Sequence, residues 1–161
     1  MYNGEIYTVK VEKVCNDLLP LKEIIEKTNV DEKYYLSDSN IEKFRYLKGG
    51  KRIPRIKPNG VGYTYAEGSM PFPDNLESPA RTMLTSESSI NRTTHVVEDY
   101  ITKKLRLITP IEAERINGFP DNWTNVGMTD KKRYFMMGNA LVVGIVKKIG
   151  IELEKIVSNE D

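Results

Sequence analysis

The sequence predicts an α+β fold in which an irregular region of short strands and loops is followed by C-terminal helices. Helical periodicity is absent between Gly49 and about Val97, a region that holds five of the eight prolines. Residues that begin and end helices return beyond residue 101. The length of 161 residues, with 39% apolar and 29% charged side chains, suits one soluble domain with its own core.

The composition narrows the classes of function. A formal net charge of +1 gives no overall attraction to nucleic acid, so any such binding must rest on local clusters of charge. One cysteine excludes an internal disulfide framework and favours the reducing cytoplasm. No apolar run approaches membrane-spanning length, and a lone histidine without cysteine neighbours predicts no metal site.

Three elements are expected before residue 49. The alternation over residues 7–11 predicts a strand. The segment Pro20–Lys27 predicts a short helix with an apolar face made by Leu21, Ile24 and Ile25. Ser39 and Glu42 have the spacing of a capping box for a second helix. The apolar face of that helix would carry Ile41, Phe44 and Leu47.

Three helices are expected beyond residue 101. The first begins at Thr109, where Glu112 completes a capping box, and ends at Gly118 in a left-handed conformation. The second begins at residues 129–130 and is expected to stop at Gly138. The closing helix is amphipathic, with apolar residues at steps of three and four: Val142, Ile145, Val146, Ile149, Leu153 and Ile156.

A basic cluster is the local feature best suited to nucleic acid. Residues 43–57 contain seven cations and no carboxylate, namely Lys43, Arg45, Lys48, Lys51, Arg52, Arg55 and Lys57. Such a run can hold several phosphates, and Arg92 and His95 would extend it. The alternative is a solvated face, which is the commoner role of a charge run. For His95, a buried and hydrogen-bonded imidazole is equally open.

Two ordered strings near the C-terminus carry a family resemblance. Thr109–Trp123 reads Thr-Pro-x-Glu-Ala-x-Arg-x-x-Gly-Phe-Pro-Asp-x-Trp, and Arg133–Val143 contains Gly-Asn-Ala-Leu. In this order and spacing they resemble the last two sequence blocks of bacterial-type DNA (cytosine-5) methyltransferases. The chain therefore resembles the C-terminal half of such an enzyme. Its closing helices would complete an S-adenosylmethionine-dependent methyltransferase α/β fold.

The resemblance assigns roles within these two blocks. Asn139 and Ala140 would contact S-adenosylmethionine. Four residues would be structural members of the blocks: Glu112, Arg115, Gly118 and Gly138. Glu112 and Arg115 lie three apart on one helical turn, spaced for a side-chain pair that braces the recognition region. The alternative for that pair is a solvated surface ion pair.

A third string, Pro79-Ala80-Arg81-Thr82-x-x-Thr85, resembles the core of the target-recognition region in one subgroup of these enzymes. Arg81 would donate two hydrogen bonds to the O6 and N7 atoms of a guanine, while Thr82 and Thr85 would contact phosphates or a thymine methyl group. The alternative is a strand whose arginine faces water. The resemblance divides the chain into a connection over 1–19, a target-recognition region over 20–100, and C-terminal motifs with the closing helix over 101–161.

The catalytic groups of that family are not found in this chain. The family's catalytic cysteine follows a proline, whereas Cys15 lies between Val14 and Asn16. The resemblance therefore implies double-stranded DNA as the substrate and a separate catalytic subunit that carries the Pro-Cys motif. The alternative is that the chain is a truncated or excised piece of such an enzyme. That subunit would share the S-adenosylmethionine pocket, and the chain alone would transfer no methyl group.

The resemblance also implies a cellular setting, and two alternative functions stay open beside it. It implies a restriction-modification system in a prokaryotic cytoplasm, with the protein associated with the nucleoid. The apolar closing helix would leave an exposed patch, so self-association of the isolated chain is expected. A non-catalytic, sequence-specific DNA-binding protein that reuses a recognition region is the first alternative. A small α+β domain that binds another protein is the second.

Overall fold

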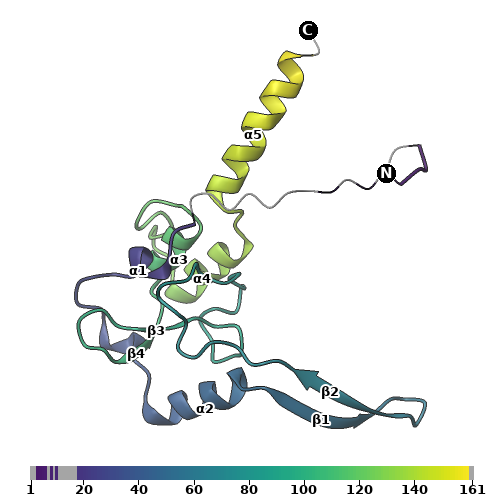
Figure 1. The fold of residues 1–161 in the computed structure, drawn as a ribbon. Helices are drawn as coiled ribbons and strands as arrows, with labels where there is room; N and C mark the ends of the chain where they lie inside the picture. The colour runs from purple at the N-terminus through teal and green to yellow at the C-terminus, as the bar shows by residue number, and fades with distance from the viewer. Residues whose placement is uncertain (1–2, 7, 9, 11–17, 160–161) are drawn as a thin grey trace.

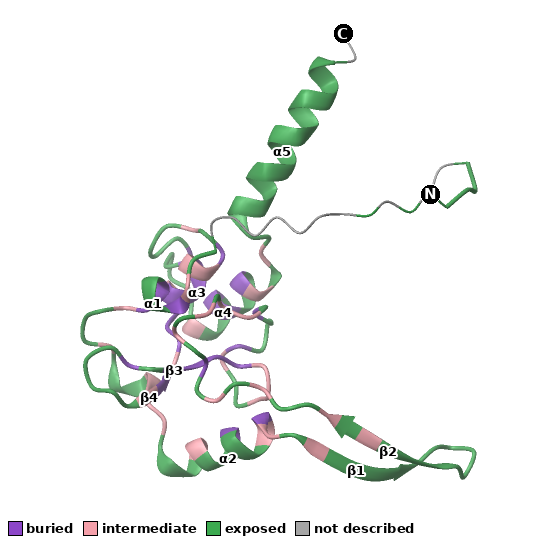
Figure 2. Ribbon diagram, viewed as in Figure 1, coloured by how far each residue is buried: buried purple, intermediate pink, exposed green. Residues whose placement is uncertain are grey.

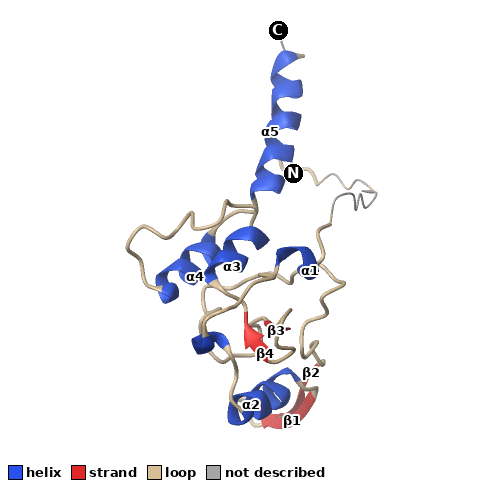
Figure 3. Cartoon of the chain, turned by 90° about the vertical axis from the view of Figure 1, so that its left-hand side faces the viewer, coloured by secondary structure: helices blue, strands red, loops and turns tan. Residues whose placement is uncertain are grey.

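The structure is a computed structural model that describes residues 3–6, 8, 10 and 18–159. A central body of helices and loops carries two projections, a β-hairpin and the C-terminal helix, which leave it at opposite ends (Figures 1 and 3). The elements are α1 (Leu21–Ile24), the 3-10 helix η1 (Glu32–Tyr34), α2 (Asp38–Lys48), β1 (Lys51–Ile56), β2 (Gly62–Glu67), β3 (Val96–Glu98), β4 (Leu105–Leu107), α3 (Pro110–Ile116), α4 (Asp130–Asn139) and α5 (Val143–Ser158).

The predicted α+β class is confirmed. In the described residues the strands form two small antiparallel sheets, β1 with β2 and β3 with β4. The expected irregular region is also present, because a long loop connects β2 to β3 without a helix of its own. The strand predicted over residues 7–11 lies largely outside the described residues, which omit 7, 9 and 11.

The two N-terminal helices differ from prediction at their ends. Helix α1 stops at Ile24 because Ile25 is already extended, yet the predicted apolar face is buried. Helix α2 is capped by Ser37, whose hydroxyl accepts from the Asn40 amide at 3.4 Å. The predicted capping box is therefore wrong, since Ser39 lies inside the helix. Phe44 of α2 is fully buried and stacks on Phe72.

Helix α3 begins and ends as predicted. The Thr109 hydroxyl accepts from the Glu112 amide at 3.2 Å, and the Glu112 carboxylate accepts from the Thr109 amide at 2.7 Å. These reciprocal bonds satisfy two N–H groups that would otherwise lack partners at the start of the helix. Gly118 follows the helix with φ near +80°, the left-handed conformation that glycine adopts at low cost.

The last two helices are present, with one correction. Helix α4 continues through Gly138 to Asn139, so the predicted stop at Gly138 is wrong. Helix α5 confirms the predicted closing helix, and none of its residues is buried (Figure 2). Gly144 and Gly150 have no atom within 4 Å of an added Cβ, so neither is required there by close packing.

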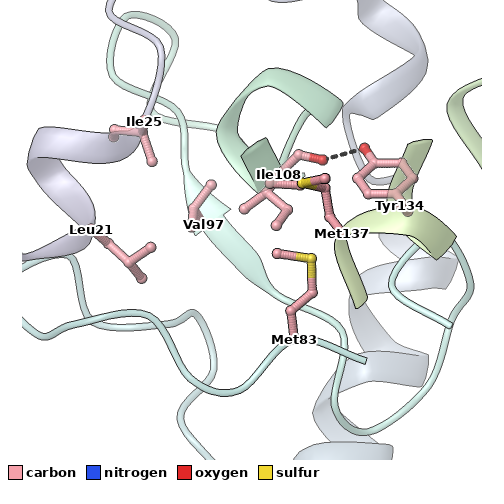
Figure 4. Close-up of a cluster of buried hydrophobic side chains, with 8 residues drawn as sticks. Leu21, Ile25, Met83, Val97, Ile108, Tyr134 and Met137 are labelled. Atoms are coloured by element: carbon pink, nitrogen blue, oxygen red, sulfur yellow. Dashed lines mark hydrogen bonds between the residues drawn. The ribbon is translucent and has the colours of Figure 1, made fainter. Parts of the chain in front are cut away.

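The hydrophobic core joins segments that lie far apart in the sequence, from α1 to α4. It consists of Leu21, Ile25, Met83, Val97, Ile108, Ala113, Tyr134 and Met137 (Figure 4). The Tyr134 hydroxyl donates to the Ile108 carbonyl at 2.5 Å, which satisfies the one polar atom of that side chain. Because the cluster joins α1, β3, α3 and α4, these elements hold one another in place.

A buried ion pair lies beside this core. The Arg106 guanidinium donates to both oxygens of Glu112, at 2.7 and 2.8 Å, and to Asp99 at 2.9 Å. Glu112 also accepts from the backbone amides of Thr109 and Glu26, each at 2.7 Å. Arg106 and Glu112 are both fully buried.

The predicted pair between Glu112 and Arg115 is therefore wrong. Arg115 instead binds the Asp121 carboxylate through two nitrogens, at 2.6 and 2.7 Å, and the Ile24 carbonyl at 2.9 Å. The two residues thus face different partners, although each one contacts the segment around α1. Both residues still hold α3 in place. Glu112 does so through Arg106 and the Glu26 amide, and Arg115 through the Ile24 carbonyl, rather than through a pair on the helix surface.

We predict that Glu112→Gln lowers the free energy of unfolding by about 3–5 kcal/mol, because Arg106 stays buried without its main counter-charge. Urea unfolding measures the loss. The matched control is Glu152→Gln, which breaks an exposed pair with Lys155 on α5 and should change stability little. Equal losses in the two variants would contradict the prediction.

Candidate functional site

A cavity of about 570 Å³ lies between α1, the loop over residues 79–83 and the adjoining ends of α3, α4 and α5. Its walls are mostly apolar or small, and both C-terminal sequence blocks contribute to them. Leu18 and Leu19 stand at its edge and are each 62% exposed. The cavity is thus an apolar hollow whose rim remains open to solvent.

One wall depends on a close approach of two backbones. An added Cβ at Gly138 would lie 2.4 Å from the Thr85 nitrogen and 2.5 Å from the Leu84 carbonyl carbon. Only glycine allows α4 to approach this loop so closely. In this structure Gly138 permits close packing and does not end the helix.

Asn117 joins the three helices around the cavity. Its side-chain amide donates to the carbonyls of Ala113 in α3 and Met137 in α4, at 3.3 and 3.1 Å. Its own carbonyl accepts from the Val143 amide at 2.9 Å, at the start of α5. The sequence places Asn117 inside the first block, yet no local signal identifies these distant partners.

The two candidate cofactor residues are placed differently. Ala140 lines the cavity, whereas Asn139 is exposed and is not among the lining residues. The Asn139 side-chain amide donates to the Phe135 carbonyl at 2.9 Å, within α4. No carboxylate lines the cavity in the described chain. The cavity therefore offers an apolar surface, but no carboxylate acceptor for ligand hydroxyl or ammonium groups.

Arg81, the predicted guanine reader, is partly buried at the cavity and is paired with an internal carboxylate. Its guanidinium binds the Asp74 carboxylate at 2.6 and 3.1 Å and the Thr93 carbonyl at 2.9 Å. Asp74 is buried and also accepts from the Val96 amide at 2.9 Å. Burial raises the pKa of Asp74, but the bonds from Arg81 and Val96 hold that pKa below its usual value. Contact of Arg81 with a base stays a prediction and would require this ion pair to open.

Lys48 shares the same buried carboxylate. Its ammonium lies 3.2 Å from Asp74, and its side chain is 1% exposed. Burial lowers the pKa of this ammonium. Lys48 is therefore a structural partner of Asp74 rather than an accessible member of the basic run. No sequence pattern predicts this pair, because Asp74 follows a Pro-Phe-Pro segment far along the chain from α2.

The other predicted recognition residues divide between surface and interior. Thr82 is exposed and lines the cavity, and Thr85 is exposed with its backbone against Gly138. His95 is fully buried, with Nδ1 lying 3.0 Å from the Glu87 carboxylate. The predicted contact of His95 with DNA is therefore corrected to the alternative of a buried imidazole, because water and phosphates do not reach it in this conformation.

Lys51, Arg52 and Arg55 lie on the β1–β2 hairpin. Arg52 and Arg55 are exposed, and the Arg55 guanidinium lies 4.2 Å from the centre of the Tyr65 ring. Lys51, at the base, is partly buried, with its ammonium 3.8 Å from Glu67 and 4.3 Å from the Tyr46 ring centre. The cations best placed for an external anion are therefore those beyond the base.

Arg92 anchors the base of this hairpin. Its guanidinium donates to the carbonyls of Leu47 and Gly49, at 3.0 and 3.3 Å, and to the Gly68 carbonyl. It also binds the Glu67 carboxylate at 3.1 Å. These bonds join the end of α2 and the turn before β1 to the end of β2. In this conformation Arg92 positions the hairpin, and its predicted contact with DNA stays untested.

Two further findings concern the described residues alone. In that part of the chain, no group of three or more His, Cys, Asp or Glu side chains is placed to hold a metal ion. No helix there is both long and apolar enough to cross a membrane.

Comparison with known sequences places the chain in a family. A model described as C-5 cytosine-specific DNA methylase matches residues 5–155. The chain is 53% identical over 156 residues to Type II methyltransferase M.Sau3AI of Staphylococcus aureus, which covers 97% of this chain and 37% of the relative. It is 26% identical over 147 residues to Type II methyltransferase M.HpaII of Haemophilus parainfluenzae, covering 86% and 39%. The chain thus spans less than half the length of these relatives.

Two solved structures share the fold. The S. pombe Dnmt2 methyltransferase aligns with a TM-score of 0.57 at 16% identity, covering 85% of this chain and 42% of that one. The Entamoeba histolytica methyltransferase EhMeth aligns with a TM-score of 0.54 at 17% identity, covering 98% and 45%. These likenesses confirm the expected methyltransferase fold.

Gly138→Ala should lower the free energy of unfolding by about 1–3 kcal/mol or more, because the new methyl group meets backbone atoms that have no rotamer to change. The control is Gly150→Ala in α5, where space is open and the better helix propensity of alanine should add about 1 kcal/mol. Thermal and urea unfolding test both. Effects of the same sign would contradict the close-approach argument.

Arg92→Ala should loosen the hairpin by about 1–2 kcal/mol, since it removes charge-assisted bonds to four acceptors at the base. Hydrogen exchange at residues 51–56 and 62–67 should accelerate about tenfold, while exchange in α5 stays unchanged. Arg52→Ala, in the same hairpin but outside this anchor, is the matched control. Unchanged exchange in Arg92→Ala would show that strand pairing alone holds the hairpin.

Proposed function

Since the chain belongs to the C-5 cytosine-specific DNA methylases, we propose that it supplies two parts of such an enzyme. One part is recognition of a specific DNA site. The other is one wall of the S-adenosylmethionine pocket, for transfer of a methyl group to C5 of a cytosine in that site. The proposal includes a second, catalytic portion on a separate subunit.

The observation that carries this proposal is the open apolar surface around the cavity. Leu18, Leu19, Val142 and Ile145 line it and are all more than a third exposed. The surface continues along α5, where Ile149, Leu153 and Ile156 are each about half exposed, at 55%, 56% and 55%. An apolar stripe of this extent marks an interaction site. A catalytic portion that packs on it would also close the cavity.

The composition of the cavity suits a shared cofactor site. Small and apolar residues such as Ala80, Gly118 and Ala140 line the cavity, and in the proposed role they would contact one face of the adenosyl group. S-adenosylmethionine also carries ribose hydroxyls and an ammonium group, which usually pair with carboxylates. Since no carboxylate lines the cavity among the described residues, these partners would come from the catalytic portion. The bound cofactor would supply the methyl group from its sulfonium.

The same division applies to the chemistry on DNA. In the family reaction the target cytosine leaves the duplex, and a cysteine thiolate attacks its C6 atom. Cys15 does not follow a proline, so the thiolate would come from the Pro-Cys loop of the catalytic portion. Residues of this chain would hold the flanking duplex, with Thr82, Thr85 and the exposed hairpin arginines as candidates. M.Sau3AI is named a Type II methyltransferase, and we extend a restriction-modification role in the prokaryotic cytoplasm to this chain.

A second candidate is a DNA-binding protein without catalytic activity. The observation in its favour is that this chain itself carries the exposed cations of the hairpin. Binding of DNA phosphates by these cations would need no residue from a partner. Such a protein would bind duplex DNA without a partner and would need no cofactor. Its apolar cavity would then serve self-association rather than catalysis.

The discriminating experiment begins with the whole chain as bait in its native host, with bound proteins identified by mass spectrometry. We expect a larger stoichiometric partner with a Pro-Cys loop and a glycine-rich loop. Labelled S-adenosylmethionine and duplex DNA are then added to the chain, to the partner and to both. Methyl transfer is expected only with both.

Two outcomes would overturn the proposal. One is methyl transfer by the chain alone. The other is tight, stoichiometric binding of S-adenosylmethionine to the chain alone in calorimetry, because half a pocket should bind it weakly. If no partner is recovered and the chain binds duplex DNA in a salt-dependent way, the second candidate is favoured.

A further inference from the structure

We propose that the β1–β2 hairpin enters the major groove of B-form duplex DNA as a two-stranded ribbon, with Arg55 as its base-reading side chain. The inference rests on the proposed function, which assigns DNA recognition to the chain. It goes further by naming one element, one groove and one specificity-determining residue.

The shape of the hairpin is the first argument. It projects from the body, and most of its residues are exposed on both faces (Figures 1 and 2). Each strand has six residues and is therefore about 20 Å long. The major groove of B-form DNA, about 12 Å wide, accepts a two-stranded ribbon of this kind.

A purely structural role would not account for this projection. An isolated two-stranded hairpin is marginal in water, because it buries little apolar surface. None of the residues of β1 and β2 belongs to the core cluster. The hairpin therefore contributes little to the fold, and its order and charge are best suited to an external partner.

The charge of the hairpin identifies that partner. Its strands and connecting loop carry four cations, Lys51, Arg52, Arg55 and Lys57, and one carboxylate, Glu67. The Glu67 carboxylate forms ion pairs with Arg92 and Lys51 at the base of the hairpin. Among the described residues, Arg52, Arg55 and Lys57 make no ion pair. The outer part of the ribbon thus presents uncompensated positive charge to a polyanion.

The register of the strands orients the cations. Arg55 lies opposite Tyr63, and Ile53 lies opposite Tyr65, so these four residues share one face. The Arg55 guanidinium lies over the Tyr65 ring, 4.2 Å from its centre, and the Lys57 ammonium lies 5.9 Å from the Tyr63 ring centre. Arg52 lies on the opposite face, where it suits a phosphate.

The Arg55 guanidinium is prepared for a base edge. The contact with the Tyr65 ring restrains the Arg55 guanidinium, and its N–H groups make no hydrogen bond within the described residues, so they are free to donate. A forked pair of N–H donors matches O6 and N7 of guanine in the major groove. Arg81, the other candidate, already donates to Asp74 and Thr93 and offers no such free fork.

The same geometry argues against duplex RNA. The major groove of A-form RNA is deep and narrow and does not admit side chains on a ribbon. B-form DNA is therefore the partner that fits the hairpin. Double-stranded RNA and a protein partner become outcomes of the test.

The first experiment uses the whole 161-residue chain and a fluorescent pool of random-sequence duplex DNA. In a shortened variant, Asn-Gly replaces residues 53–65 and connects Arg52 to Ala66, which face each other in the register. The base of the hairpin and its Arg92 anchor remain. We expect the shortened chain to lose at least about tenfold in affinity, because two cations and the ribbon are removed. Competition by a major-groove ligand, methyl green, should weaken binding of the unaltered chain, whereas the minor-groove ligand netropsin should not.

The second experiment tests Arg55 by in vitro selection from the same pool, followed by sequencing. Arg55→Ala should lose about tenfold in preference for guanine at one position, as a forked contact implies. Arg55→Lys should lose it as well, because an ammonium has no fork. The control Lys132→Ala removes an exposed charge on α4 and should keep the preference.

The outcomes separate this inference from the proposed function. If the unaltered chain binds no duplex DNA, both the proposed recognition role and this inference are overturned. If the unaltered chain binds but the shortened chain binds equally well, only the hairpin inference is overturned. Equal loss for all sequences in Arg55→Ala overturns its base-reading role. Equal binding to duplex RNA, or netropsin competition alone, overturns the groove assignment.

Discussion

The Glu112 carboxylate is the group on which the arrangement of the molecule most depends. It accepts four hydrogen bonds, two from Arg106 in β4 and two from the backbone amides of Thr109 and Glu26. A buried charge is tolerated only when all of its hydrogen-bonding capacity is used, so these four donors fix one another's positions. Helix α3, strand β4 and the segment after α1 therefore meet in a single way, and that meeting sets two walls of the cavity.

Features that depend on nearby residues could be read from the sequence. The cap of α3 at Thr109, the left-handed Gly118 and the amphipathic pattern of α5 are local or periodic, and each is present as predicted. The family could also be recognised from the sequence, since its two C-terminal blocks are long and occur in the expected order. The start of α2 was misplaced because Ser37 and Ser39 are both suitable caps, and the sequence does not distinguish between them.

Features that depend on distant partners could not be read in this way. Arg106 stands between two leucines in a strand, an alternation that indicates a solvent-facing side chain, yet it is fully buried against Glu112. Arg81 likewise has a buried partner in Asp74 that no spacing rule suggests. The arginines of this chain thus fall into two groups that sequence alone does not separate. Some are neutralised inside the body, and others, such as Arg52 and Arg55, remain outside it without a counter-charge.

The contact between Gly138 and the Leu84–Thr85 backbone has a consequence for how this protein can evolve. The contact is made by main-chain atoms on one side and by a residue without a side chain on the other. Side chains at positions 84 and 85 can therefore be replaced while the contact between this loop and α4 keeps its geometry. Under the proposed function, substitutions in this loop would change the preferred DNA sequence while the cavity wall beside Gly138 keeps its position. One glycine thus separates the geometry of this contact from the identity of the side chains beside it.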